Sequence, residues 1–159
     1  MRTTTTTKVV PLLQPLFATA DTDYNATIDT KGFDFCTITF LGSATLMHSS
    51  LSICSVTECD TSGGTYTAID KLTLGNAAAI DLDGSAVPLT DTDDGDTIVF
   101  QVDCSENRKR FLKLNTKSAA GGNSIYAAVG VLSRVTDMGP DSNTNACTAV
   151  TGTAKVLRA

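Results

Sequence analysis

Apolar and polar residues alternate with a period of two along much of this chain, and this pattern constrains its fold more than any other feature. The alternation is clearest in Phe33–Leu41, where Cys36, Ile38 and Phe40 fall on one face of an extended segment. The two phenylalanines at the start of this segment fall on the opposite face, which indicates a bulge or a strand covered on both sides. No stretch shows the 3.6-residue repeat of an amphipathic helix. The sequence therefore predicts β-structure.

Similar runs of strand-forming residues recur along the chain, separated by Gly, Asp and Pro at the expected turns. We predict strands at about 24–30, 33–41, 50–58, 66–69, 97–102, 110–114 and 125–135, with a weaker one at 78–82. Seven to nine antiparallel strands predict an all-β domain, a β-sandwich or jelly roll. With 159 residues the chain is long enough for one such domain with its own core.

The two ends of the chain differ from its middle. Pro11 and Pro15 interrupt an apolar N-terminal segment, and because proline removes a backbone donor, neither a helix nor a central strand fits there. We predict an extended N-terminal arm over 1–23, a β-sandwich domain over 24–138 and an extended C-terminal tail over 139–159. Four apolar side chains of the arm need a covering surface, either on their own domain or on a neighbouring subunit: Leu12, Leu13, Leu16 and Phe17.

Charge and hydropathy argue against nucleic-acid and membrane partners. The net charge is −5, whereas binding to phosphates depends on clustered Lys and Arg. The basic cluster Arg108, Lys109 and Arg110 is interpreted either as a solvated turn or as a contact to an acidic partner. No apolar run approaches the roughly 20 residues of a membrane span, and the N-terminus lacks the apolar segment of a signal peptide. We expect a protein that is made and assembled in a cytoplasm.

The five cysteines are an odd number and include no CxxC pair. In a chain without a secretion signal they are expected to be small buried apolar side chains rather than disulfides. A bridge between Cys54 and Cys59 across a tight bend is the alternative. The set comprises Cys36, Cys54, Cys59, Cys104 and Cys147.

No pattern in the chain predicts catalysis, a cofactor or a metal site. His48 is the one histidine, and its neighbours Ser49 and Ser50 lack the third, orienting group of a catalytic triad. The stretch Asp91–Asp96 resembles the start of an EF-hand loop, but position twelve is Val102, which has no carboxylate to bind calcium. We interpret this stretch as a solvated turn, with a looser surface calcium site as the alternative. The chain is therefore not expected to be an enzyme.

Four segments together resemble small structural proteins of tailed phages and prophages. Tyr24–Ile38 is similar to their opening pattern, and Glu58–Tyr66 is loosely similar to a hairpin in their middle. Arg108–Leu114 matches a later Arg-Lys-Arg-aromatic-Leu strand, and Leu132–Arg134 matches the Leu-Ser-Arg end of the last strand. The resemblance covers about residues 24–135. It implies a structural virion protein that binds the outside of a capsid lattice and stabilises it, known as a cement or decoration protein.

The implied partners are the major capsid protein and further copies of the chain, in a cyclic homo-oligomer such as a trimer. The implied location is the capsid surface. The apolar residues of the arm are the first expected contact, and the basic cluster is the second. Two other classes stay open, namely a head–tail connector or tail-tube subunit, and a receptor- or carbohydrate-binding spike module. The absence of Trp and the presence of only three Tyr weigh against the sugar-binding class.

Overall fold

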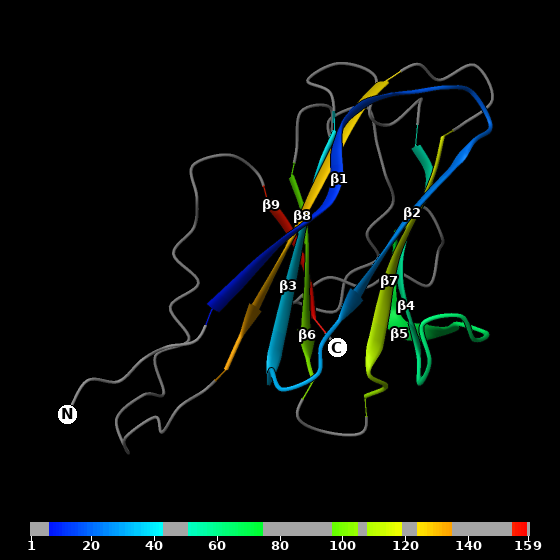
Figure 1. Ribbon diagram of the computed structural model, residues 1–159. Helices are drawn as coiled ribbons and strands as arrows, with labels where there is room; N and C mark the ends of the chain where they lie inside the picture. Colours follow the sequence, from blue (N-terminus) through cyan, green and yellow to red (C-terminus); the bar gives the residue numbers. More distant parts are fainter. Residues whose placement is uncertain are drawn as a thin grey trace.

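The computed structural model describes residues 7–42, 51–74, 97–104, 108–118, 124–134 and 154–158. Within these residues the chain forms nine β-strands in two sheets and no helix (Figure 1). The strands are β1 (Thr7–Ala18), β2 (Asp23–Asp29), β3 (Phe35–Leu41), β4 (Leu51–Cys59), β5 (Thr67–Leu74), β6 (Thr97–Asp103), β7 (Phe111–Ser118), β8 (Ser124–Ser133) and β9 (Ala154–Arg158). The prediction of an all-β sandwich is confirmed.

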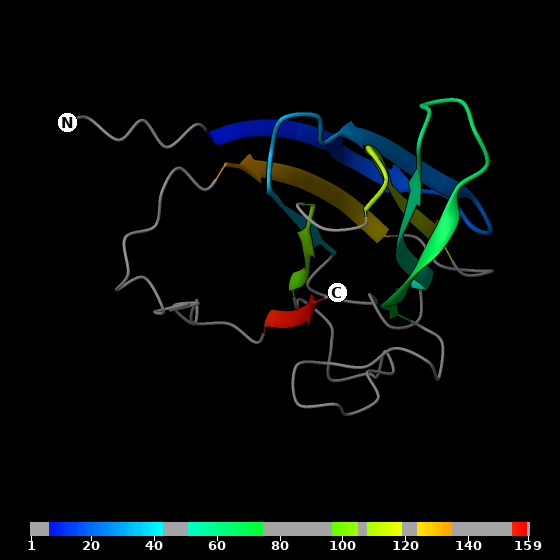
Figure 2. The same cartoon turned by 90° about the horizontal axis from the view of Figure 1, so that it is seen from below.

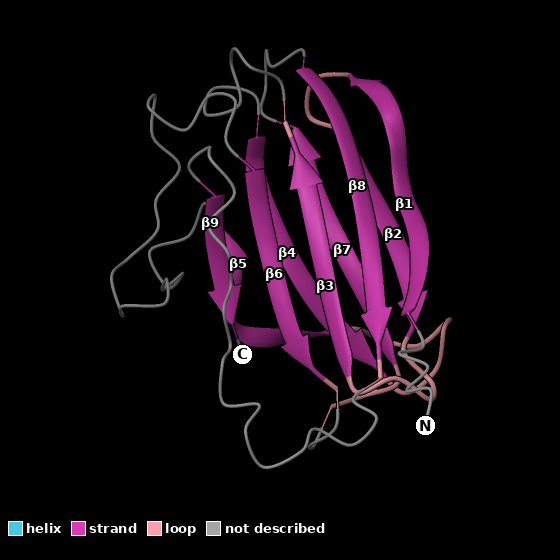
Figure 3. Ribbon diagram, turned by 90° about the vertical axis from the view of Figure 1, so that its left-hand side faces the viewer, coloured by secondary structure: helices cyan, strands magenta, loops and turns pink. Residues whose placement is uncertain are grey.

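The strand order is that of a jelly roll. Sheet A has the order β1-β8-β3-β6-β9 and sheet B the order β2-β7-β4-β5; Figure 3 shows sheet A in front of sheet B. The first strand pairs with the eighth, the second with the seventh, the third with the sixth and the fourth with the fifth. A long hairpin rolled around a core gives this pairing, which defines the two Greek keys of a jelly roll.

The N-terminal arm predicted over 1–23 is instead, from Thr7 to Ala18, a strand of the sandwich itself. It pairs antiparallel with β8, with register shifts between Pro11 and Leu13 and between Leu13 and Leu16. Both prolines are tolerated because β1 is the edge strand of sheet A and because its ladder is irregular next to them. The chain then passes to β2, the edge strand of sheet B, so that β1 and β2 lie along the same side of the sandwich (Figure 2).

The C-terminal tail that was predicted to be extended over 139–159 contains a strand instead in part of its length. Ala154–Arg158 forms β9, which pairs with β6 in parallel rather than antiparallel orientation. Val156 and Leu157 supply the strand-forming residues of this short segment. The remainder of the predicted tail and the weak strand predicted at 78–82 lie outside the described residues.

The core lies between the sheets and is built from the inward residues of each alternating strand. Cys36, Ile38 and Phe40 are buried on one face of β3, as predicted, and Phe35 is exposed on the other. The Tyr126 ring packs against Phe40, with centroids 5.3 Å apart. The largest fully buried side chains are Tyr126, Phe40, Phe100, Ile38, Ile69, Leu72, Leu74, Ile98, Leu112, Leu114 and Leu132.

The described cysteines are free thiols. Cys36, Cys54 and Cys59 are buried, which confirms for them the predicted role as small core residues, and Cys104 is half-buried. The alternative bridge between Cys54 and Cys59 is wrong, since both thiols are free on the single strand β4. Burial raises the pKa of Cys36 to about 12 and that of Cys104 to about 11.

Candidate partner-binding surface

Segments that are far apart in sequence meet at one end of the sandwich. The strand β2 ends at Asp29, whose two carboxylate oxygens accept hydrogen bonds from Arg110 Nε at 2.9 Å and Arg110 Nη2 at 2.6 Å. The backbone N–H and the hydroxyl of Thr30 both donate to the Arg110 carbonyl, at 3.0 Å and 2.7 Å. A bidentate ion pair and two further hydrogen bonds thus fix the β2–β3 turn against the start of β7.

The same turn is fixed against the end of β8. Gly32 has φ 83°, a left-handed conformation that glycine adopts without strain, and its carbonyl accepts a hydrogen bond from Arg134 Nε at 2.8 Å. The Asp34 N–H donates to the Ser133 carbonyl at 3.0 Å. Residues that are about 100 positions apart in sequence are therefore held together at this corner.

Arg108 and Lys109 also make their contacts within the domain. Glu58 at the end of β4 accepts a hydrogen bond from the Lys109 N–H at 3.2 Å, and its other oxygen lies 3.8 Å from Arg108 Nη1. The Lys109 ammonium donates to the Thr67 hydroxyl at 3.3 Å. The basic cluster predicted as a partner contact is thus engaged with Glu58, Thr67 and Asp29, so that it contributes to holding this end of the fold.

Arg110 also alters the acidity of its partner. Hydrogen bonds from this guanidinium, followed by one from the Lys31 N–H, hold the pKa of Asp29 at about 2, despite partial desolvation in the opposite direction. The guanidinium carbon lies 4.8 Å from the centre of the Phe111 ring. Arg110 therefore combines an ion pair with a stacking contact, a combination that lysine would not reproduce.

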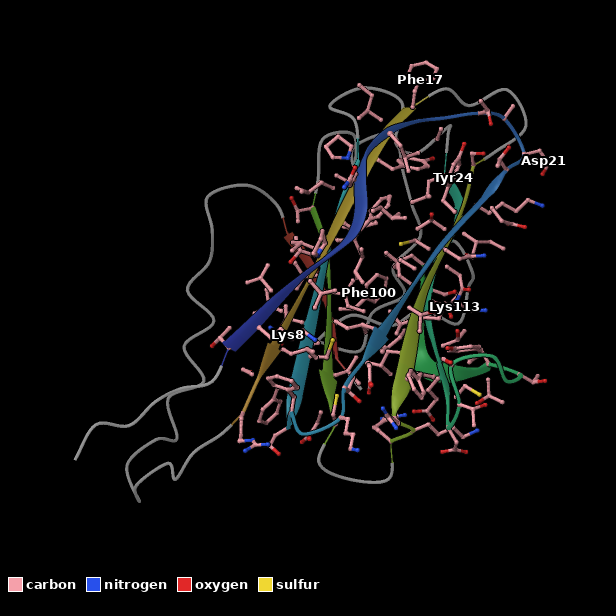
Figure 4. The ribbon with its side chains drawn as sticks, viewed as in Figure 1. Lys8, Phe17, Asp21, Tyr24, Phe100 and Lys113 are labelled. Atoms are coloured by element: carbon pink, nitrogen blue, oxygen red, sulfur yellow. The ribbon has the colours of Figure 1, made fainter. Side chains whose placement is uncertain are left out.

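The four apolar residues predicted for partner contact separate into two groups. Leu13 is buried, and Leu12 and Leu16 pack against the core. Phe17 is 64% exposed and points away from the sandwich at the end of β1 (Figure 4). It lies at the opposite end of β8 from Arg134, so the structure does not bring it together with the basic cluster.

Phe17 belongs to an apolar surface that the sequence did not predict. Its cross-strand neighbour is Ile125, which is 53% exposed, and Leu41 lies beside the next outward residue of β8, Ala127. We call the outward side of the strands β1, β8, β3 and β6 of sheet A the apolar face. Its residues are Thr7, Val9, Pro11 and Phe17 on β1, Ile125, Ala127, Val129, Val131 and Ser133 on β8, Phe35, Thr37, Thr39 and Leu41 on β3, and Thr97, Val99, Gln101 and Asp103 on β6.

The outward side of sheet B, here called the polar face, has a different character. Lys117 pairs with Asp21 at 3.0 Å, and Asn115 Nδ2 donates to the Thr57 hydroxyl at 2.9 Å. The Lys113 ammonium lies 4.2 Å from the centre of the Tyr66 ring. Its outward residues on β2 and β7 are Asp23, Asn25, Thr27, Asp29, Phe111, Lys113, Asn115 and Lys117. Several charged and amide groups on this side thus have partners within the domain.

Other sequence candidates fall outside what the structure describes. His48 and Asp91–Asp96 lie in the undescribed residues. Among the described residues there is no group of three or more His, Cys, Asp or Glu side chains that could hold a metal ion. In that same part of the chain no helix is long and apolar enough to cross a membrane.

The apolar face had a signal in the sequence. The segment from Ile125 to Leu132 is almost continuously apolar, as in a strand covered on both sides. A strand covered on both sides was also one of the two interpretations of the start of β3.

Comparison of the chain with protein-family models, with curated proteins and with solved structures finds no match.

Proposed function

We propose that this chain is a structural virion protein that binds the outside of a phage capsid lattice and stabilises it. One observation carries the proposal. Three segments that resemble phage structural proteins, far apart in sequence, contact one another through Asp29–Arg110 and Gly32–Arg134. The resemblance therefore involves residues that hold the corner of the fold together, and not only a general alternation of apolar residues. The proposed partners are the major capsid protein and further copies of the chain.

The jelly-roll architecture supports the proposed role on a capsid by analogy. Jelly-roll domains recur in viral capsid layers, although lectins and cupins share the architecture. A rigid sandwich with one apolar and one polar outer face suits a protein that acts by covering and linking neighbours. The same features are compatible with a connector or tail-tube subunit, which stays the alternative.

A carbohydrate-binding role is less favoured because the tyrosines are engaged elsewhere. Tyr126 is fully buried, and the Tyr24 hydroxyl accepts a hydrogen bond from the Thr19 N–H at 2.8 Å while its ring meets that of Tyr126. The face of Tyr66 is occupied by Lys113. A sugar ring needs an open aromatic face, which the buried Tyr126 does not offer and which Lys113 occupies on one side of Tyr66.

The proposal is tested with heads assembled in the absence of this chain. Such heads should release their DNA at a lower temperature than complete heads, and addition of the purified chain should restore both co-sedimentation and thermal stability. Heads that neither bind the added chain nor change in stability would contradict the cement function. Recovery of the chain with purified tails instead of heads would favour the connector or tube class.

A further inference from the structure

The apolar face has the composition of an interface between subunits. Five of the six large apolar side chains that are exposed among the described residues lie on it, and the sixth, Ile53, lies on the polar face. The five are Val9, Phe17, Phe35, Leu41 and Ile125, with exposed fractions from 39% to 64%. Apolar groups gathered on one side in this way, rather than scattered singly, mark an interaction site.

These residues lie side by side on the paired strands, with two register shifts of β1 between Pro11 and Leu16. Phe17 faces Ile125 across β1 and β8, and Leu41 faces Ala127 across β3 and β8. Further along the strands, the row that contains Val9 and Val131 continues the surface. The large exposed side chains therefore extend from one end of the sheet to the other.

Charge is nearly absent from this surface. Of the outward residues that the structure describes on these four strands, Asp103 is the charged one, and it lies at the end of β6 opposite Phe35. Lys8 lies opposite the buried Leu132 and so belongs to the other side of β1. The polar face, by contrast, carries Asp and Lys side chains on neighbouring strands.

The area is at the lower limit for a specific contact. The strands β1, β8, β3 and β6 contain 12, 10, 7 and 7 residues. At about 3.3 Å per residue and about 4.8 Å between strands, they span roughly 570 Å² of sheet plane. Two such faces in full overlap would bury on the order of 1,100 Å², which is just above the roughly 1,000 Å² that a specific interface should exceed.

We propose that the apolar face binds the same face of a second copy of this chain, across a twofold axis. The packing would be that of two stacked sheets about 10 Å apart, with Phe17 and Ile125 of each copy as the main anchors. This inference concerns self-association alone and does not depend on a virion role.

The near-absence of charge on this face favours a second copy over a foreign protein. Each chain carries a net charge of −5, and contact through the apolar face places few like charges opposite one another. A face with so little charge also offers little electrostatic complementarity by which to select a different partner. Homodimer interfaces, in comparison, are the more apolar class, with charged residues depleted at their centre.

The test is sedimentation of the purified full-length chain over a range of concentrations, with two matched variants. Ile125→Lys places a charge at the centre of the apolar face, and Ile53→Lys places the same charge on the polar face, at a residue of comparable exposure. We expect a dimer whose dissociation constant rises about 30-fold or more in Ile125→Lys, as for a loss at an interface hot spot, and stays within a few-fold of wild type in Ile53→Lys. Circular dichroism establishes that both variants are folded.

Two results would overturn this inference. One is a chain that stays monomeric up to a concentration of about 100 μM, a range in which a stable dimer of this area is formed. The other is association that both variants weaken equally. If the chain is monomeric and Ile125→Lys instead abolishes binding to heads, the apolar face is a capsid contact and the second-copy proposal fails while the proposed function survives.

Discussion

Arg110 holds both carboxylate oxygens of Asp29, 81 positions away in the sequence, at 2.9 Å and 2.6 Å. This pair joins the turn after β2 to the start of β7, and it lies next to the Gly32–Arg134 hydrogen bond that joins the same turn to the end of β8. The corner therefore links both sheets of the jelly roll through side chains as well as through the chain itself.

The ion pair predicts a specific dependence of stability on pH. The pKa of Asp29 is about 2 in the folded chain and about 3.9 in an unfolded one. Because the folded pKa is the lower, the contribution is present above about pH 4 and is lost as the pH falls toward about 2. Asp29→Asn should lower the free energy of unfolding at pH 6 by about 1 kcal/mol or less, since the pair is partly exposed.

Denaturant titrations of wild type and Asp29→Asn at pH 6 and near pH 2 measure this effect. The other carboxylates titrate in both proteins, so the difference between the two isolates Asp29. We expect this difference to shrink at the lower pH. A difference that is the same at both pH values would mean that the charge of Asp29 contributes nothing.

Gly32→Ala should destabilise the same corner. The position has φ 83°, which an L-residue with a side chain rarely adopts, and the new Cβ would lie 3.1 Å from Arg134 Nη2. We expect a loss of about 1–3 kcal/mol in thermal or chemical unfolding. Gly63→Ala is the control, because a Cβ there meets no atom within 4 Å. Equal stability of the two variants would contradict the expectation that a side chain at position 32 is strained.

Gly130 is predicted to be required for close packing of the two sheets. A Cβ at this position of β8 would lie 2.7 Å from Ile28 Cδ1, which reaches across from β2. Gly130→Ala should therefore cost about 1–3 kcal/mol by overpacking. Ile28→Val removes the obstructing methyl group, so the double variant should recover part of the loss. A double variant whose losses simply add would show that the contact is not the cause.

The thiols should differ in reactivity according to burial. Thiolate is the reactive form, and burial raises the pKa of Cys36 to about 12 and that of Cys54 above the normal range for a thiol. With iodoacetamide at pH 8, peptide mapping should find Cys36 and Cys54 unlabelled in the native chain and labelled in denaturant. Native labelling of Cys54 as fast as in denaturant would contradict the core described above.

Removal of β1 distinguishes a structural strand from a dispensable arm. A deletion of residues 1–18 would expose the paired edge of β8 and remove Leu13 and Ala18 from the core. We expect loss of the cooperative unfolding transition, monitored by circular dichroism. A deletion of residues 1–6, which spares β1, is the comparison. A folded product of the longer deletion would restore the prediction of a separate arm.

Most of the described strands could be predicted from the sequence, because their inward apolar residues alternate regularly with outward residues. Thr97–Asp103 and Phe35–Leu41 agree with their predicted ranges to within two residues. The strand β1 was missed because its two prolines suggest an irregular segment, and only its position at the sheet edge, next to register shifts, makes them compatible with a strand.

The order of strands and the role of the basic cluster required the structure. Nothing local in the sequence indicates that the first strand pairs with the eighth, because their contacts join residues more than 100 positions apart. In the same way, the sequence alone indicates a surface charge at Arg110, and only the structure shows that Asp29 lies beside it. The apolar face was detectable in principle, but its extent depends on how β1, β8 and β3 align.

The central claim is that this chain is part of a virion, and a density map of the complete particle tests it most directly. We expect jelly-roll domains repeated over the outer surface of the capsid lattice, at a constant ratio to the major capsid protein. A particle whose map and protein composition contain no copy of the chain would contradict the claim.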